Sequence, residues 1–216
     1  MPKAQFSRGK KIAFTVVMFL YINLVLTIFW ILKPLKKTLF FKQYDGDNPF
    51  KIGPLEMLAS SAELLAKGAN MFIAFLLVVF LTMITRYVKR QALTLTCMGL
   101  IVIMTIFFAI RINNPSESVI WSFYWFGDIY ISLMLAAFFS FLHDTIDLKN
   151  AKSLYGFIVL GAVSGGAVGS TYFMIDEMTY QQWLHVVIGV GLTICFLATC
   201  AGWIAKSIPH HETDSE

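Results

Sequence analysis

Asp128 is the residue whose chemistry and position say most about this chain. It lies near the middle of an apolar run over residues 119–142, and it is the one Asp, Glu, Lys or Arg inside any of six such runs. A bare carboxylate at membrane depth costs about 3 kcal/mol or more, so protein or water normally receives it. Two interpretations stay open, a buried ion pair or helix–helix hydrogen bond, and a charge on a substrate or proton path. We favour the second.

Lysines gather directly after the first apolar run. Lys33, Lys36 and Lys37 follow it within about one helical turn. A single lysine at this place is explained by an ammonium group that reaches the lipid headgroups. As a cluster beside the mouth of a translocation path, the three would attract a polyanion.

The other reactive residue types form no catalytic or metal-binding pattern. Cys97, Cys195 and Cys200 all lie within apolar runs, where small packing residues are the simplest interpretation. His185 fits an interfacial or hydrogen-bonded side chain better than a proton relay. The sequence contains no phosphate loop, no HExxH, no GxSxG and no paired carboxylates within the apolar runs. We therefore expect no enzyme, no cofactor and no metal site.

Six apolar runs must position these residues, and each is long enough to cross a bilayer as a helix. They cover residues 12–32, 68–85, 92–110, 119–142, 154–174 and 183–204. Hydrophobic residues make up 57% of the chain and charged residues 14%, which excludes an ordinary soluble domain and disorder. We expect an all-α polytopic membrane protein, with an N-terminal segment (1–11), a six-helix transmembrane domain (12–204) and a polar tail (205–216). The net charge of +4 does not indicate nucleic acid, because topology and membrane lipid explain the basic residues.

The distribution of basic residues predicts the orientation. Ten Lys and Arg residues fall on the side of the N-terminus and seven on the other side. Because positive residues are enriched in cytoplasmic loops, both termini are expected in the cytoplasm. Nearly all of the outer basic residues lie in one segment, 33–67, which suggests another use for its lysines.

The first connection between spans is the long one. Pro34 removes a backbone hydrogen bond, so we expect the first helix to kink or end there. Residues 45–49 are typical of a turn. Pro54 suits the first turn of a new helix, on which Glu63 and Lys67 have the spacing of an i,i+4 pair.

Glycines define one face of the fifth span. Gly161, Gly165 and Gly169 form two overlapping GxxxG steps. Small residues at this spacing let another helix approach closely. We expect packing within the chain, ahead of a dimer seam or a substrate groove.

Four segments, at residues 32–39, 123–128, 151–155 and 161–169, together resemble the ATP/ADP antiporter family, the nucleotide transporters of plastids and obligate intracellular bacteria. Residues 123–128 (FYWFGD) resemble the family's Phe-Tyr pair followed by an acid. Residues 151–155 (AKSLY) resemble its AK(K/R)xF/Y loop, and the glycine-rich run 161–169 follows at the expected distance. Residues 32–39 resemble its basic segment after the first helix, with Lys37 in place of the acid.

The resemblance implies a major-facilitator-like fold, in which each half is a three-plus-three inverted repeat and substrate binds between two halves. It implies that Lys33 and Lys36 attract phosphates and that Asp128 belongs to the translocation path. It also implies a bacterial inner membrane. Family members have about twelve spans, twice the number expected here, so a second copy or another protein would supply the second half.

Three functions remain open once this resemblance is taken into account. The first is a half-size transporter for a nucleotide or another anion. The alternative is a non-transporting six-helix structural subunit of a larger membrane complex, favoured by the missing half and by the scarcity of charges in the spans. A third, weaker possibility is a small proton- or ion-coupled carrier that uses Asp128 alone.

Overall fold

The structure is a computed structural model that describes residues 8–44, 49–52, 55–84, 90–145, 148–175 and 177–206. Its helices are α1 (Arg8–Gln43), α2 (Ala59–Ile84), α3 (Arg90–Arg111), α4 (Glu117–Thr145), α5 (Leu148–Ile175) and α6 (Tyr180–Lys206). Within the described residues, these six helices are long and apolar enough to cross a membrane. The expectation of an all-helical polytopic chain is confirmed at this level.

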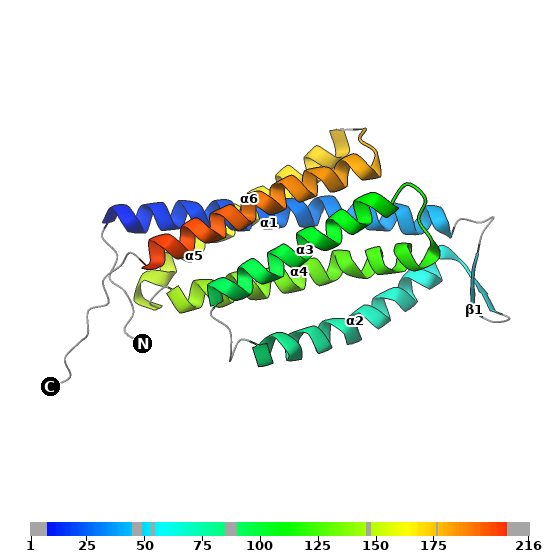
Figure 1. Cartoon of the computed structure of the whole chain (residues 1–216), viewed down its shortest axis with the longest axis horizontal. Coiled ribbons are helices and arrows are strands. Elements are labelled where there is room, and N and C mark those ends of the chain that lie inside the picture. The colour runs from blue at the N-terminus through cyan, green and yellow to red at the C-terminus, as the bar shows by residue number, and fades with distance from the viewer. Residues whose placement is uncertain are drawn as a thin grey trace.

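Helix α1 lies at the centre of the bundle (Figure 1). It packs against α4, α5 and α6, while α3 packs against α4 and α6. Helix α2 packs mainly on α4 and lies at the edge of the bundle. The start of α1 and the end of α6 lie at one end of the bundle, and the strands lie at the other end. The chain therefore crosses the bundle an even number of times.

The first helix does not end at Pro34, so that alternative is wrong. Helix α1 continues through Pro34 to Gln43. Proline removes one hydrogen bond and strains the preceding turn, but the turns that follow are held by burial. Leu35, Leu39 and Phe40 are all buried in the core. Packing of these side chains keeps the segment helical, because it outweighs the lost bond.

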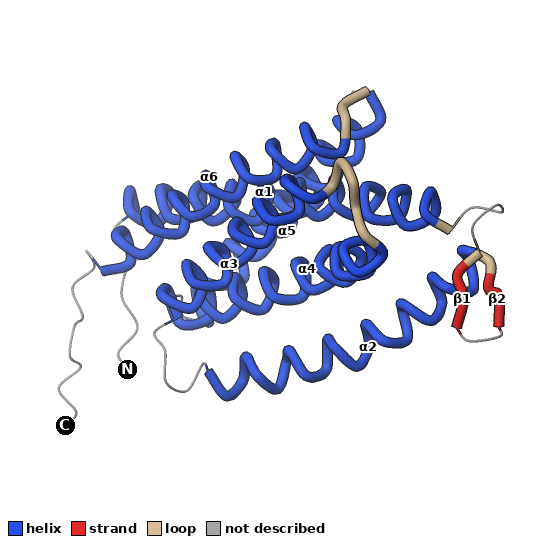
Figure 2. Tube along the Cα trace, turned by 45° about the vertical axis from the view of Figure 1, so that its right-hand side comes forward, coloured by secondary structure: helices blue, strands red, loops and turns tan. Residues whose placement is uncertain are grey.

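The helix expected to start at Pro54 begins five residues later. Two short strands, β1 (Phe50–Ile52) and β2 (Leu55–Met57), instead pair in antiparallel fashion before α2 starts (Figure 2). Lys51 pairs with Glu56 across the ladder, and their charged atoms are 2.7 Å apart. Cross-strand opposite charges stabilise such a pair of strands. The turn predicted over residues 45–49 lies mostly outside the described residues.

An aromatic cluster holds together the end of the bundle at which the strands lie. Phe40 of α1 and Tyr44, which directly follows that helix, both contact Trp121 of α4, and Phe50 of β1 packs on the same indole. The Tyr44 hydroxyl donates to a Glu117 carboxylate oxygen at 2.8 Å, and Trp121 Nε1 donates to Tyr44 at 2.6 Å. Burial and the adjacent Glu117 raise the pKa of Tyr44, so its hydroxyl keeps the proton that it donates.

The glycine face of α5 lies directly against α1. A methyl group on Gly161 would lie 2.7 Å from the Phe19 carbonyl oxygen, and one on Gly169 would lie 2.5 Å from that of Thr27. Gly165 approaches Asn23 even more closely. Because the glycines lack side chains, the two backbones come near enough for polar contacts between the helices. Partner atoms from the same chain therefore occupy this face.

Candidate functional site

The site is built around an ion pair between α1, the central helix of the bundle, and α4. Lys36 Nζ pairs with Asp128 Oδ1. The Lys36 side chain is 7% exposed, and the Asp128 side chain is 27% exposed. Lys36 reaches this depth because α1 stays helical beyond Pro34, which places it beside the buried Leu35. The carboxylate at membrane depth therefore has a charged partner from another helix.

Gly127 and Tyr124 shape the space that Lys36 occupies. A methyl group built on Gly127 would lie 2.7 Å from Lys36 Cδ, so the glycine leaves room for the lysine stem. The Lys36 ammonium nitrogen lies 4.4 Å from the centroid of the Tyr124 ring. An ammonium over an aromatic face gains electrostatic stabilisation. One turn of α4 thus supplies the space, the ring and the carboxylate that hold a single lysine.

Tyr124 connects the ion pair to a second charged group on α2. Its hydroxyl donates to Glu63 Oε1 at 3.3 Å. The same carboxylate oxygen lies 3.0 Å from Lys67 Nζ and 3.7 Å from Lys37 Nζ. Glu63 itself is buried, whereas the two lysines are largely exposed. The polar groups therefore run from the exposed edge of α2 to the buried ion pair.

Lys33 occupies a different part of α1. Its ammonium nitrogen lies 4.6 Å from the Trp30 ring centroid and 5.7 Å from that of Phe29. Trp30 in turn faces Gly166 of α5. The structure thus brings Lys36 to Asp128 and places Lys33 against aromatic rings one turn earlier.

Sequence reasoning missed Glu63 and Gly127 as parts of this site. Glu63 lies outside the apolar run expected for the second span, so its burial was not anticipated. One signal was available, because Ala62 and Ala66 flank it and small residues on a helix favour close packing. The signal at Gly127 was a mid-helix glycine adjacent to the intramembrane acid. The described spans therefore hold at least three buried or partly buried charges, Lys36, Glu63 and Asp128.

The Lys36 ammonium group and the Asp128 carboxylate can each exchange their partner for another charged group. Lys36 is compensated by Asp128, and either charge left alone would be destabilising by about 3–5 kcal/mol. An external anion at Lys36, or a proton on Asp128, would change that balance. Among the described residues no group of three or more His, Cys, Asp or Glu could hold a metal ion.

Comparison of the chain with protein-family models, with curated proteins and with solved structures found no match. The class of protein therefore rests on the fold and the site. Six apolar helices around a buried ion pair fit an integral membrane protein. The six apolar helices support that class directly.

Proposed function

We propose that the chain is one half of a secondary transporter for an organic anion of the nucleotide type. A second copy or another membrane subunit supplies the other half. The protein lies in a bacterial inner membrane with both termini in the cytoplasm. The observation that carries the proposal is the Lys36–Asp128 ion pair between α1 and α4.

The pairing of helices supports a three-plus-three repeat. Exchanging α1, α2 and α3 with α4, α5 and α6 turns the α1–α5 contact into the α4–α2 contact. The same exchange turns α1–α6 into α4–α3, and it maps α1–α4 and α3–α6 onto themselves. A pseudo-twofold axis between α1 and α4 would relate the two sets of three helices in this way. Transporters in which each half is such a repeat bind substrate near the midplane of the membrane, between the two halves.

The ion pair joins α1 and α4 and suits the binding of an anion. Lys36 is nearly buried, so the lysine needs a negative partner in every state of the protein. An anionic substrate that replaces Asp128 supplies that partner and lets the pair open. The ion pair therefore opens only when an anionic substrate is bound at Lys36. An exchanger requires this coupling between substrate binding and conformational change.

A flux assay with matched variants tests the proposal. Purified protein in liposomes should exchange labelled nucleotides, and Asp128→Asn and Lys36→Gln should each reduce the rate to near background. The control is the exposed pair on the two strands, where Lys51→Gln and Glu56→Gln should leave the rate within about twofold, because exposed pairs contribute little. Absence of exchange by the wild-type protein, alone and with any co-purifying subunit, would refute the proposal.

A structural subunit remains the second candidate, and one observation favours it. Much of α2 presents large apolar side chains away from the bundle, among them Met71, Phe72 and Phe75. Such a surface can receive a neighbouring membrane helix as well as lipid. This candidate predicts purification at fixed stoichiometry with other subunits and no flux. It also predicts that removing both charges together restores the stability lost by removing one.

A further inference from the structure

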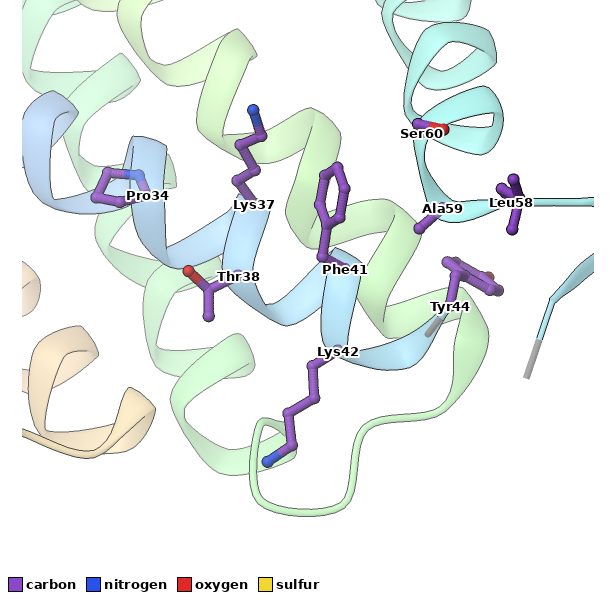
Figure 3. Close-up of a pocket in the computed structure, with 9 residues that line it drawn as sticks. All are labelled: Pro34, Lys37, Thr38, Phe41, Lys42, Tyr44, Leu58, Ala59 and Ser60. Atoms are coloured by element: carbon purple, nitrogen blue, oxygen red, sulfur yellow. The ribbon is translucent and has the colours of Figure 1, made fainter. Parts of the chain in front are cut away.

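A pocket of about 950 Å³ lies between the second half of α1 and the start of α2. Its walls combine apolar and basic side chains, namely Pro34, Lys37, Thr38, Phe41, Lys42, Tyr44, Leu58, Ala59 and Ser60. Figure 3 shows the Lys37 and Phe41 side chains pointing to the same side of α1, whereas Lys42 points to the other side. The pocket thus places the apolar Phe41 ring beside the Lys37 side chain.

A carboxylate of the protein already binds the lysines at the border of this pocket. Lys37 lines the pocket and also lies 3.7 Å from Glu63, which follows Ala59 by one turn on the same face of α2. Lys67 reaches the same carboxylate oxygen at 3.0 Å. The two lysine side chains are 57% and 58% exposed, so an external ligand can reach both ammonium groups.

The charges around this carboxylate do not balance. Among the described residues, Lys37 and Lys67 share the carboxylate of Glu63, and Lys42 lines the pocket from the other side of α1. A group with more negative charge than one carboxylate would compensate them better. A phosphate monoester carries close to two charges at neutral pH, and a phosphodiester presents several acceptor oxygens to the ammonium groups.

We propose that this pocket binds an organic phosphate whose phosphate group displaces Glu63 from Lys37 and Lys67. The apolar part of the ligand packs against Phe41 and Pro34. The Glu63 carboxylate competes with the ligand for the two ammonium groups, and it pairs with them again when the ligand dissociates. This pocket adjoins the Lys36–Asp128 pair through Glu63 and Tyr124, and its occupancy can be measured without any transport.

Two sources offer this chemistry, the phospholipids of the bilayer and soluble phosphate esters. Binding to the full chain in a neutral detergent is measured separately for dioleoylphosphatidylglycerol and for phenyl phosphate. Dioleoylphosphatidylcholine, which has no net charge, serves as the reference lipid. Either charged probe supports the site, and the one that binds more tightly identifies the source.

If the proposal holds, substitutions of Glu63 and of Lys37 change the affinity for the phosphate probe in opposite directions. Glu63→Gln keeps the acceptor for Tyr124 but removes the charge, so affinity should rise on the order of fivefold. Lys37→Gln should lower affinity by a similar factor, whereas the matched control Lys206→Gln, at the other end of the bundle, should have no effect. All variants are first checked for unchanged melting temperature without ligand.

Three outcomes would overturn the inference. Binding of neither probe to the wild-type chain removes the site. Unchanged or weaker binding by Glu63→Gln shows that Glu63 does not compete with the ligand. Equal losses in Lys37→Gln and Lys206→Gln show that the probe follows net charge rather than this pocket.

Discussion

Gly165→Ala tests the contact between α1 and α5 with a single added methyl group. That methyl group would point at the backbone of Asn23, with its carbonyl oxygen as the nearest atom. A backbone carbonyl cannot rotate away as a side chain can, so the helices themselves must separate. Separation also lengthens the hydrogen bond from the Thr27 hydroxyl to the Gly165 carbonyl oxygen, now 3.1 Å.

The expected loss of stability follows from three terms. Overpacking against immovable atoms is destabilising by about 3 kcal/mol, at the upper end of its usual range. Weakening one or two interhelical hydrogen bonds adds about 1 kcal/mol. Replacing glycine by alanine in a helix stabilises the folded state by roughly 1 kcal/mol, because alanine has the higher helix propensity. The net loss for Gly165→Ala is therefore about 3 kcal/mol.

The same helix contains a matched control at Gly156. A methyl group there would meet nothing within 4 Å, so Gly156→Ala should be neutral or stabilising by up to about 1 kcal/mol. Both variants can be measured by reversible unfolding in mixed micelles with increasing SDS. Equal unfolding midpoints for Gly165→Ala and Gly156→Ala would refute the reasoning, because a glycine without a packing role responds only through propensity.

Three further predictions address the orientation, the ion pair and the aromatic cluster. Cysteine variants of Ser7 and Ser215 should be labelled from the same, cytoplasmic face, and labelling from opposite faces would exclude an even number of spans. Gly127→Ala should displace the Lys36 side chain and weaken its ion pair with Asp128, which lowers the unfolding free energy by about 1–3 kcal/mol. Gly99→Ala is the control and should be neutral, because a methyl group there meets open space. Equal melting temperatures for the two variants would contradict this prediction. Tyr44→Phe removes the hydroxyl that donates to Glu117 and accepts from Trp121, so the unfolding free energy should fall by about 1–2 kcal/mol. An unchanged unfolding midpoint would show that both hydrogen bonds are dispensable.

Much of the fold could be predicted from the sequence because a bilayer imposes strong local rules. A membrane span must satisfy its own backbone hydrogen bonds and present apolar side chains, so each span is a contiguous apolar segment. The ends of four helices, α3 to α6, lie within a few residues of the predicted runs except at the start of α5, which begins six residues early. The glycine spacing on α5 likewise indicated close packing without reference to any partner.

The candidate site depended on contacts between segments far apart in the sequence. The acid at position 128 required a partner, but proximity in sequence cannot identify one. The partner, Lys36, follows a proline at which the helix was expected to stop or kink. Only burial of Leu35, Leu39 and Phe40 against the rest of the bundle keeps that turn helical.

The sequence alone determined that the chain enters the membrane and that one carboxylate within it must be compensated. Both follow from the free energy of transferring each residue type into hydrocarbon, which is a local property. The tertiary structure decided that Lys36 compensates it, that Gly127 leaves the space, and that Glu63 joins the site through Tyr124. These choices depend on which helix faces which, because packing free energy arises from pairs of segments rather than from any one of them.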